Sequence, residues 1–310
     1  MIPLQSHQIR GNWATLLLPV DADDSISLSR LGDEIDQLIA MKVDGIYSNG
    51  TAGEFYNQTE NEFDAVNSLL AAKCNRAGMP FQVGCSHMSP QLSLERLKRS
   101  LAWQPSAIQV ILPDWFPPSM EEVIVFLRKM EEAAVGTPLV LYNPPHAKKR
   151  LTPADFKTIR EAGIHLAGCK VPGGDAAWYR DMLGQNPELS VFIPGHHLAT
   201  GVKAGAHGAY SNVACLHPAV AQQWYDSMHT AMDAALELET RIQRFMTEHI
   251  VPYITQQGYS NQAVDKLLAA VGGWADVGTR LRWPYRWIAE EEVSGVREAA
   301  KRLVPEFFEY

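Results

Sequence analysis

Residues 138–170 read PLVLYNPPHAKKRLTPADFKTIREAGIHLAGCK, and this stretch decides the fold. Its two ends, 138–142 and 166–170, are short apolar runs with the length of buried strands. Between them, Thr152-Pro153 places a proline where helices commonly begin. A strand, a helix and a second strand in this order predict two parallel strands that lie side by side.

The same alternation runs along most of the chain. Eight strands are expected, over 12–18, 45–48, 81–84, 107–112, 138–142, 166–170, 190–193 and 208–211. Eight such units within about 220 residues predict an α/β fold, a closed (β/α)8 TIM barrel, which typically takes about 250 residues. After Pro218 the strand signals stop, so we expect a C-terminal helical extension. The predicted organisation is a catalytic barrel over 1–220 and a helical region over 221–310 packed on it.

A doubly wound open sheet is the competing fold. It requires a glycine-rich phosphate turn after an early strand. The segment 50–54, Gly-Thr-Ala-Gly-Glu, does not have the Gly-x-Gly-x-x-Gly pattern of such a turn. The barrel is therefore the favoured fold.

Composition excludes several classes of protein. The chain has 310 residues and a formal net charge of −8 with no basic stripe, which argues against nucleic acid or an anionic membrane as a partner. No apolar run is long enough for a transmembrane helix, and residues 1–13 lack a secretory signal, so we expect a cytoplasmic location. The cysteines form no Cys-x-x-Cys pair and are expected to be reduced and buried: Cys74, Cys85, Cys169 and Cys215.

Lys170 closes the expected strand 166–170, and active sites of TIM barrels lie where the strands end. Burial there disfavours the ammonium form, lowers the pKa of the amine and leaves it able to form a Schiff base with a ketone. The alternative is a structural lysine paired with a loop carboxylate such as Asp175, and strand position alone does not separate the two interpretations.

Tyr142 ends the preceding strand, one βα unit upstream, so we expect it beside Lys170. A phenol there can move protons to and from the Schiff-base centre. Without Lys170, a tyrosine that closes the barrel core would be the simpler interpretation.

Two loops add candidate ligand contacts. The glycines of loop 49–54 let backbone N–H groups converge into a nest for a carboxylate, and Thr51 adds a hydroxyl.

The second loop, Pro194-Gly195-His196-His197, follows the seventh strand. Its adjacent histidines point in different directions, and no further Asp, Glu or His residues with the spacing of metal ligands accompany them. We therefore expect no metal site, and contact of His196 with a substrate hydroxyl or a plain helix start both remain open. Four other histidines are expected to be structural: His146, His165, His207 and His217.

Together these motifs resemble the dihydrodipicolinate synthase / N-acetylneuraminate lyase family of class I aldolases, from residue 11 to about residue 217. The segment 50–54 is similar to the family's Gly-[Thr/Ser]-Thr-Gly-Glu loop. The segment 142–145, Tyr-Asn-Pro-Pro, is similar to its Tyr-Asn-x-Pro strand end, and 168–170, Gly-Cys-Lys, to its Gly-x-Lys motif. The order and spacing of the motifs carry the resemblance.

The resemblance implies that Lys170 is the Schiff-base nucleophile, Tyr142 the acid/base and Thr51 a member of the proton relay. It also implies that the backbone of residues 51 and 52 holds the carboxylate of the keto acid. The expected substrate-binding residues are Gly50, Ala52, Trp115, Gly195, His196 and Ser211. The family is typically a homotetramer, a dimer of tight dimers, and uses no cofactor, and we expect the same of this chain.

Departures from the family pattern bear on the substrate. Ala52 replaces the second hydroxyl residue of the loop, and 113–116, Pro-Asp-Trp-Phe, replaces the tyrosine pair that the synthases place after the fourth strand. His146-Ala147 stands where the synthases have Ser-Arg to bind a second carboxylate. Nearby cations are candidates to replace that arginine, namely Lys148, Lys149 and Arg150. A group lost from a desolvated site typically costs a few kcal/mol, which argues against synthase activity.

The sequence therefore predicts a Schiff-base lyase, an aldolase or dehydratase, acting on a 2-keto acid. The expected substrate is a 2-keto-3-deoxy sugar acid or a related compound with pyruvate as one half, and His196-His197 argues against sialic acid because the lyases place acidic residues there. Three alternatives remain: a dihydrodipicolinate synthase with an altered relay, a barrel that binds a keto acid without turnover, and a metal-dependent aldolase.

Overall fold

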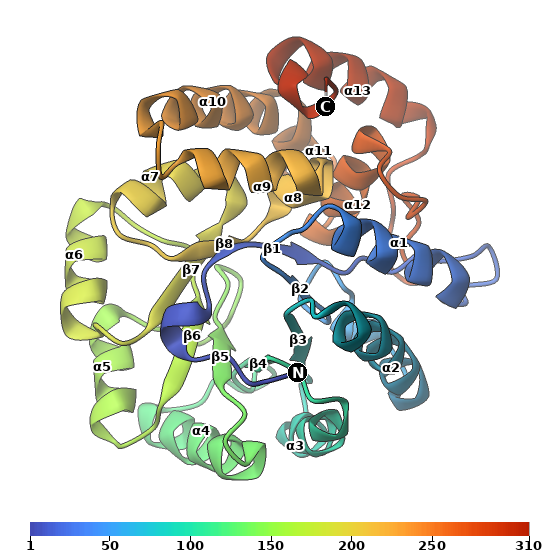
Figure 1. The fold of residues 1–310 in the computed structure, drawn as a ribbon. Helices are drawn as coiled ribbons and strands as arrows, with labels where there is room; N and C mark the ends of the chain where they lie inside the picture. The colour runs from blue at the N-terminus through green and yellow to red at the C-terminus, as the bar shows by residue number, and fades with distance from the viewer. Residues whose placement is uncertain (310) are drawn as a thin grey trace.

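The computed structural model describes residues 1–309. Eight parallel strands close into one barrel in chain order, which confirms the predicted TIM barrel (Figure 1). The strands are β1 (Gly11–Thr15), β2 (Gly45–Tyr47), β3 (Phe81–Gly84), β4 (Ala107–Val110), β5 (Leu139–Tyr142), β6 (Leu166–Lys170), β7 (Ser190–Pro194) and β8 (Gly208–Tyr210). Each expected strand overlaps an observed one, although residues 16–18 are buried outside the sheet rather than extending β1.

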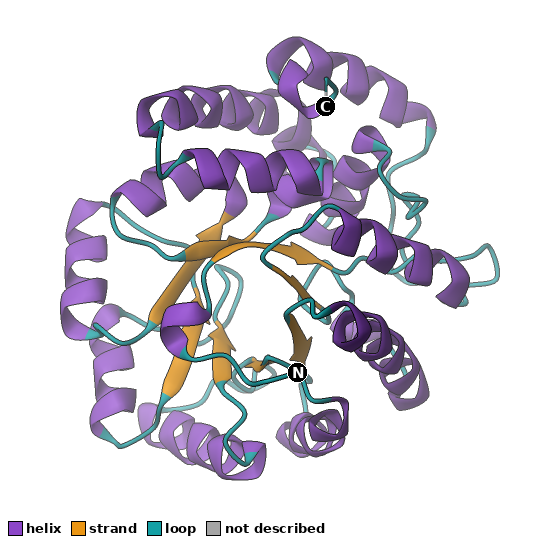
Figure 2. Cartoon of the chain, viewed as in Figure 1, coloured by secondary structure: helices purple, strands orange, loops and turns teal. Residues whose placement is uncertain are grey.

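Helices surround the barrel (Figure 2). Capping side chains set several of the helix starts. The side chains of Thr59, Ser119 and Thr152 each accept a hydrogen bond from the third helical residue and form a capping box with it. The helices between strands are α1 (Leu28–Ala40), α2 (Glu60–Ala77), α3 (Pro90–Ser100), α4 (Met120–Ala134), α5 (Pro153–Glu161), α6 (Ala176–Gln185) and α7 (Leu198–Lys203).

The chain after β8 is helical, with no strand between residue 211 and residue 309. Its helices are α8 (Asn212–Leu216), α9 (Pro218–Ser227), α10 (Met232–Phe245), the π-helical turn η5 (Met246–Ile250), α11 (Val251–Thr255), α12 (Asn261–Gly272) and α13 (Glu291–Leu303). This confirms the helical C-terminal extension. The expected boundary at residue 220 falls inside α9, which packs on β1, so the division into two regions stays a prediction.

The N-terminal segment crosses the end of the barrel where the strands begin. The backbone N–H of Leu4 donates to the carbonyl of Ser106, and the hydroxyl of Ser190 donates to the carbonyl of Ile9. The barrel interior above this segment is filled by side chains of the strands, including Trp13, Tyr47, Ala107, Val140, Ala167, Phe192 and Tyr210.

All four cysteines are buried and free, as predicted. Among residues 1–309, no helix combines the length and the apolar character needed to cross a membrane.

Candidate active site

Lys170 ends β6 and lies at the mouth of the barrel, where it lines a cavity of about 380 Å³. The residue is only 7% exposed, and this burial lowers the pKa of the amine to about 8, since the ammonium form loses its hydration. Asp175 forms no ion pair with Lys170; its carboxylate instead accepts a hydrogen bond from the backbone N–H of Trp178 at the start of α6. The interpretation of Lys170 as a lysine paired with Asp175 is therefore wrong.

Tyr142 lies beside Lys170, as predicted, because the two residues are in register on β5 and β6. The amine nitrogen of Lys170 is 5.4 Å from the centre of the Tyr142 ring. Burial raises the pKa of the phenol to about 12, so it is protonated at neutral pH. Tyr142 can therefore act first as a proton donor.

A chain of polar groups continues from Tyr142 toward the opening of the cavity. The hydroxyl of Thr51 is 3.1 Å from the Tyr142 hydroxyl and 3.4 Å from Nε2 of His146. Burial lowers the pKa of His146, with a smaller contribution from the Lys170 charge, which favours the neutral ring. His146 was expected to be structural, but the structure places it in the cavity lining.

Loop 49–54 bends through two non-glycine residues. Asn49 and Glu54 have φ angles of 55° and 48°, in the left-handed region. Gly50 is required for a different reason, since a Cβ atom there would lie 2.8 Å from the ring of Tyr47. The glycines were expected to let backbone N–H groups converge, and the structure shows that Gly50 is needed for close packing against Tyr47.

The same loop presents free hydrogen-bond donors. Thr51 and Ala52 line the cavity, and their backbone N–H groups donate to no residue of the described chain, 1–309. Two adjacent N–H groups of this kind can hold an anionic oxygen. They are available for the carboxylate of a keto acid.

His196 also lines the cavity, and Asn212 holds its ring. The Asn212 amide lies 2.9 Å from Nδ1 of His196, and its oxygen accepts from the backbone N–H of His196 at 3.2 Å. Burial lowers the pKa of His196 to about 4, so the ring is neutral. Within residues 1–309, no three His, Cys, Asp or Glu side chains are grouped as metal ligands.

The C-terminal helices supply the remaining wall, which the sequence analysis missed. Asp265 on α12 is the one carboxylate among the lining residues of this cavity. Burial raises its pKa to about 7, and the charge of Lys170 partly opposes this shift. Asp265 was missed because the sequence argument considered only residues at strand ends, and Asp265 lies on a helix. The only sequence signal for it was an aspartate within the mostly apolar stretch 263–271. The other lining residues of this wall are Gln243, Met246, Thr247, Ile250, Val251, Ile254, Asn261 and Val264.

Four predicted contact residues lie outside the cavity lining: Gly50, Trp115, Gly195 and Ser211. Trp115 is 76% exposed, with the Lys148 ammonium 5.3 Å from its ring centre. The Ser211 hydroxyl accepts from the backbone N–H of Ala214 at the start of α8, and a Cβ atom on Gly195 would lie 2.5 Å from that hydroxyl. Their contacts with substrate stay predictions.

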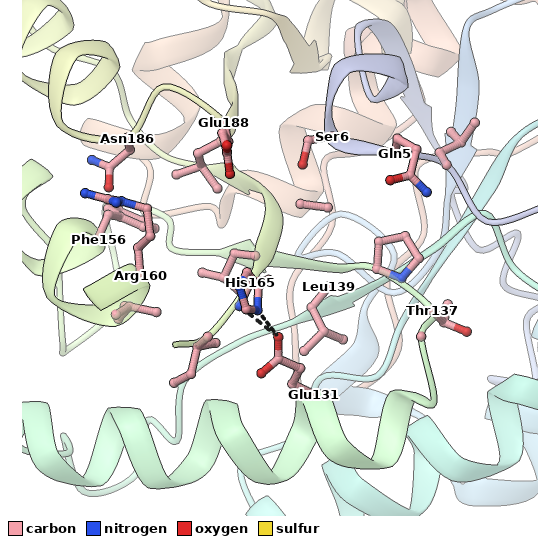
Figure 3. Close-up of a pocket in the computed structure, with 18 residues that line it drawn as sticks. Gln5, Ser6, Glu131, Thr137, Leu139, Phe156, Arg160, His165, Asn186 and Glu188 are labelled. Atoms are coloured by element: carbon pink, nitrogen blue, oxygen red, sulfur yellow. Dashed lines mark hydrogen bonds and ion pairs between the residues drawn. The ribbon is translucent and has the colours of Figure 1, made fainter. Parts of the chain in front are cut away.

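A second cavity, of about 310 Å³, lies at the other end of the barrel, near the starts of β5 and β6 (Figure 3). His165 and Glu131 face each other there, with Nδ1 of the histidine 3.3 Å from the carboxylate. Arg160 donates to the carbonyl of Gln185. The lining of this cavity includes no lysine, so it lacks an amine nucleophile.

The family model described as the dihydrodipicolinate synthetase family matches residues 8–303. The chain belongs to the dihydrodipicolinate synthetase family. This family comprises class I lyases, Schiff-base enzymes that act on pyruvate and other keto acids, and the chain is a lyase of this class.

The chain is also similar to a curated relative and to solved structures. The N-acetylneuraminate lyase of Escherichia coli O1:K1 is 26% identical over 206 residues, 64% of this chain and 67% of the relative. A prophage protein of the same family from E. coli K12, solved in complex with pyruvate, has a TM-score of 0.81 at 21% identity, covering 95% of this chain and 98% of that one. The N-acetylneuraminate lyase of Fusobacterium nucleatum also has a TM-score of 0.81, at 18% identity, covering 96% and 99%. These structural likenesses concern the fold.

Proposed function

We propose that this member of the dihydrodipicolinate synthetase family cleaves or dehydrates a 2-keto-3-deoxy sugar acid or a related 2-keto acid, with pyruvate as one half. The observation that carries the proposal is the buried, unpaired amine of Lys170 beside the phenol of Tyr142. A pKa near 8 leaves a useful fraction of this amine neutral at cellular pH.

In the proposed reaction, the amine of Lys170 attacks the C2 carbonyl carbon and water leaves, which gives an iminium ion. The iminium withdraws electrons from the bond at C3. In aldol cleavage, the C4 hydroxyl loses its proton, the C3–C4 bond breaks and an enamine remains on the lysine. In dehydration, C3 loses a proton and hydroxide leaves from C4. After aldol cleavage, the enamine takes up a proton at C3, which restores the iminium. Tyr142, through Thr51, moves these protons, and water then releases the keto acid and restores the amine of Lys170.

Recognition of the keto acid would begin at its carboxylate. The free N–H groups of Thr51 and Ala52 line the same cavity as Lys170 and can each donate to a carboxylate oxygen. No arginine lines the cavity, and Lys148, Lys149 and Arg150 all lie outside the lining. A substrate with a second carboxylate therefore lacks a cationic partner, which disfavours the synthase reaction with aspartate semialdehyde.

The proposal is tested by incubating the protein with five- and six-carbon 2-keto-3-deoxy acids. Pyruvate release is followed with lactate dehydrogenase and NADH, and dehydration by the loss of one water in the mass of the keto acid. We expect one of the two activities in the wild type and neither in Lys170→Ala. No turnover of any keto acid would contradict the proposal and favour the binding protein, whereas condensation of pyruvate with aspartate semialdehyde would favour the synthase.

We also propose that the chain assembles into a homotetramer. The family resemblance supports this, and so do Trp115 and Phe116, two adjacent aromatic side chains that are 76% and 83% exposed in the single chain. Light scattering after size-exclusion chromatography tests the proposal, and a monomeric mass would contradict it.

A further inference from the structure

Asp265 occupies an unusual position for a carboxylate. It lies on α12, is half-buried and lines the cavity that contains Lys170. Its carboxylate forms no hydrogen bond or ion pair with any residue of the described chain, 1–309. A desolvated carboxylate without a partner is costly, and such groups cluster at functional sites.

The helix that carries Asp265 is held in place on its other side. The next residue, Lys266, is fully buried and forms an ion pair with Glu54, with 3.0 Å between the nitrogen and the carboxylate oxygen. Lys266 also donates to the carbonyl of Arg280. Because Glu54 belongs to the loop that carries Thr51, this pair fixes α12 relative to the loop that would hold the keto acid.

Once the Schiff base has formed, the charges in the cavity leave Asp265 as the carboxylate that the substrate carboxylate competes with for the lysine charge. Lys170 and Asp265 are the only lysine, arginine, aspartate or glutamate side chains among its lining residues. In the Schiff base, the positive iminium on Lys170 is joined to the carbon that carries the substrate carboxylate, so these two charges offset each other. The N–H groups of residues 51 and 52 can bind that carboxylate. The iminium charge also favours the ionised form of Asp265, since an opposite charge nearby stabilises a carboxylate. A carboxylate acceptor then remains for the rest of the substrate.

We propose that Asp265 sets specificity for the half of the keto acid beyond C3, by accepting a hydrogen bond from a hydroxyl there and repelling a second carboxylate. This inference rests on the proposed function, because it assumes a Schiff base at Lys170. The acidic group comes from the C-terminal helices rather than from a strand end. A buried acceptor discriminates strongly, because a substrate without the matching donor leaves it unpaired and a second anion is repelled.

The test is borohydride trapping over a range of concentrations of three keto acids: pyruvate, 5-hydroxy-2-oxopentanoate and 2-oxoglutarate. The last two differ at the distal end, where one has a hydroxyl and the other a carboxylate. In the wild type we expect half-maximal trapping at a concentration about tenfold lower for the hydroxy acid than for 2-oxoglutarate.

The ratio of these two half-maximal concentrations is the quantity to compare between variants. In Asp265→Asn this ratio should fall toward one, and Asp265→Glu should largely restore it. Asp175→Asn is the matched control, since Asp175 caps α6 outside the cavity lining, and it should keep the wild-type ratio.

The outcomes separate the two proposals. Normal trapping of pyruvate with no preference between the longer acids, or with a preference that Asp265→Asn leaves unchanged, would overturn the role of Asp265 alone. An equal loss for all three acids in Asp265→Asn would also overturn it, because that result indicates a role in the chemistry. No adduct of wild-type protein with any keto acid would overturn the proposed function and, with it, this inference.

Discussion

The two ends of the barrel contain cavities of similar size, about 380 Å³ at the mouth and about 310 Å³ where the strands begin. They differ in the state of their ionisable groups. At the lower end, His165 lies against Glu131, and its side chain is 81% exposed to water. At the mouth, Lys170 is buried and Asp265 half-buried, and their charged groups form no hydrogen bond or ion pair within residues 1–309. Size therefore does not identify the site, whereas unpaired, desolvated charge does.

The largest effect should come from removing the nucleophile at the mouth. Lys170→Ala should lower kcat for the keto acid by at least about a thousandfold, because no other lysine lines the cavity. Lys157→Ala is the control, since Lys157 is exposed on α5, and it should behave as wild type. Steady-state kinetics gives kcat for both variants. Activity of Lys170→Ala within about tenfold of wild type would show that Lys170 is not the nucleophile and that the mouth of the barrel differs less from the lower end than proposed.

A smaller effect is expected from the proton relay. Tyr142→Phe removes the hydroxyl that lies 3.1 Å from Thr51, and kcat should fall by about 10²- to 10³-fold, as is common when a general acid or base is lost. Tyr225→Phe changes a buried tyrosine of α9 outside the cavity and should have little effect. If the two variants had equal rates, the phenol of Tyr142 would not be part of the relay.

The pH dependence of borohydride trapping tests whether the charges of Lys170 and Asp265 at the mouth of the barrel are coupled. The Lys170 pKa near 8 predicts that the rate of adduct formation with pyruvate rises with pH, with a midpoint near 8. The negative charge of Asp265 raises the pKa of Lys170, so Asp265→Asn should move the midpoint to lower pH and leave more neutral amine at pH 7. Initial rates of trapping between pH 6 and 10 measure this, and a midpoint that moves upward would contradict the coupling.

The smallest effects should come from the lower cavity. His165→Ala and Arg160→Ala should leave kcat/KM within about twofold of wild type and change the free energy of unfolding by about 1 kcal/mol or less. The reason is that the contact of His165 with Glu131 and the hydrogen bond of Arg160 to the Gln185 carbonyl are both exposed, and exposed polar contacts contribute little. Steady-state kinetics and urea denaturation check the two values. A large loss of activity with unchanged stability would show that the lower end also takes part in function.

The sequence predicted the barrel because each strand and helix has its own local pattern, and the parallel order follows from their alternation. It also predicted that Lys170 and Tyr142 are neighbours, since strand ends of adjacent units meet at one edge. Asp265 could not be found this way, because it comes from a helix about 95 residues later whose packing depends on tertiary contacts such as the Lys266–Glu54 pair. The position of His146 was missed for a similar reason, since a loop conformation decides it.

The most direct test of the central claim is borohydride reduction of the protein with pyruvate, followed by mass mapping of its peptides. We predict a reduced pyruvyl adduct on the peptide that contains Lys170, and none on that peptide in Lys170→Ala. An adduct on another lysine, or no adduct with pyruvate or any longer keto acid, would contradict the account.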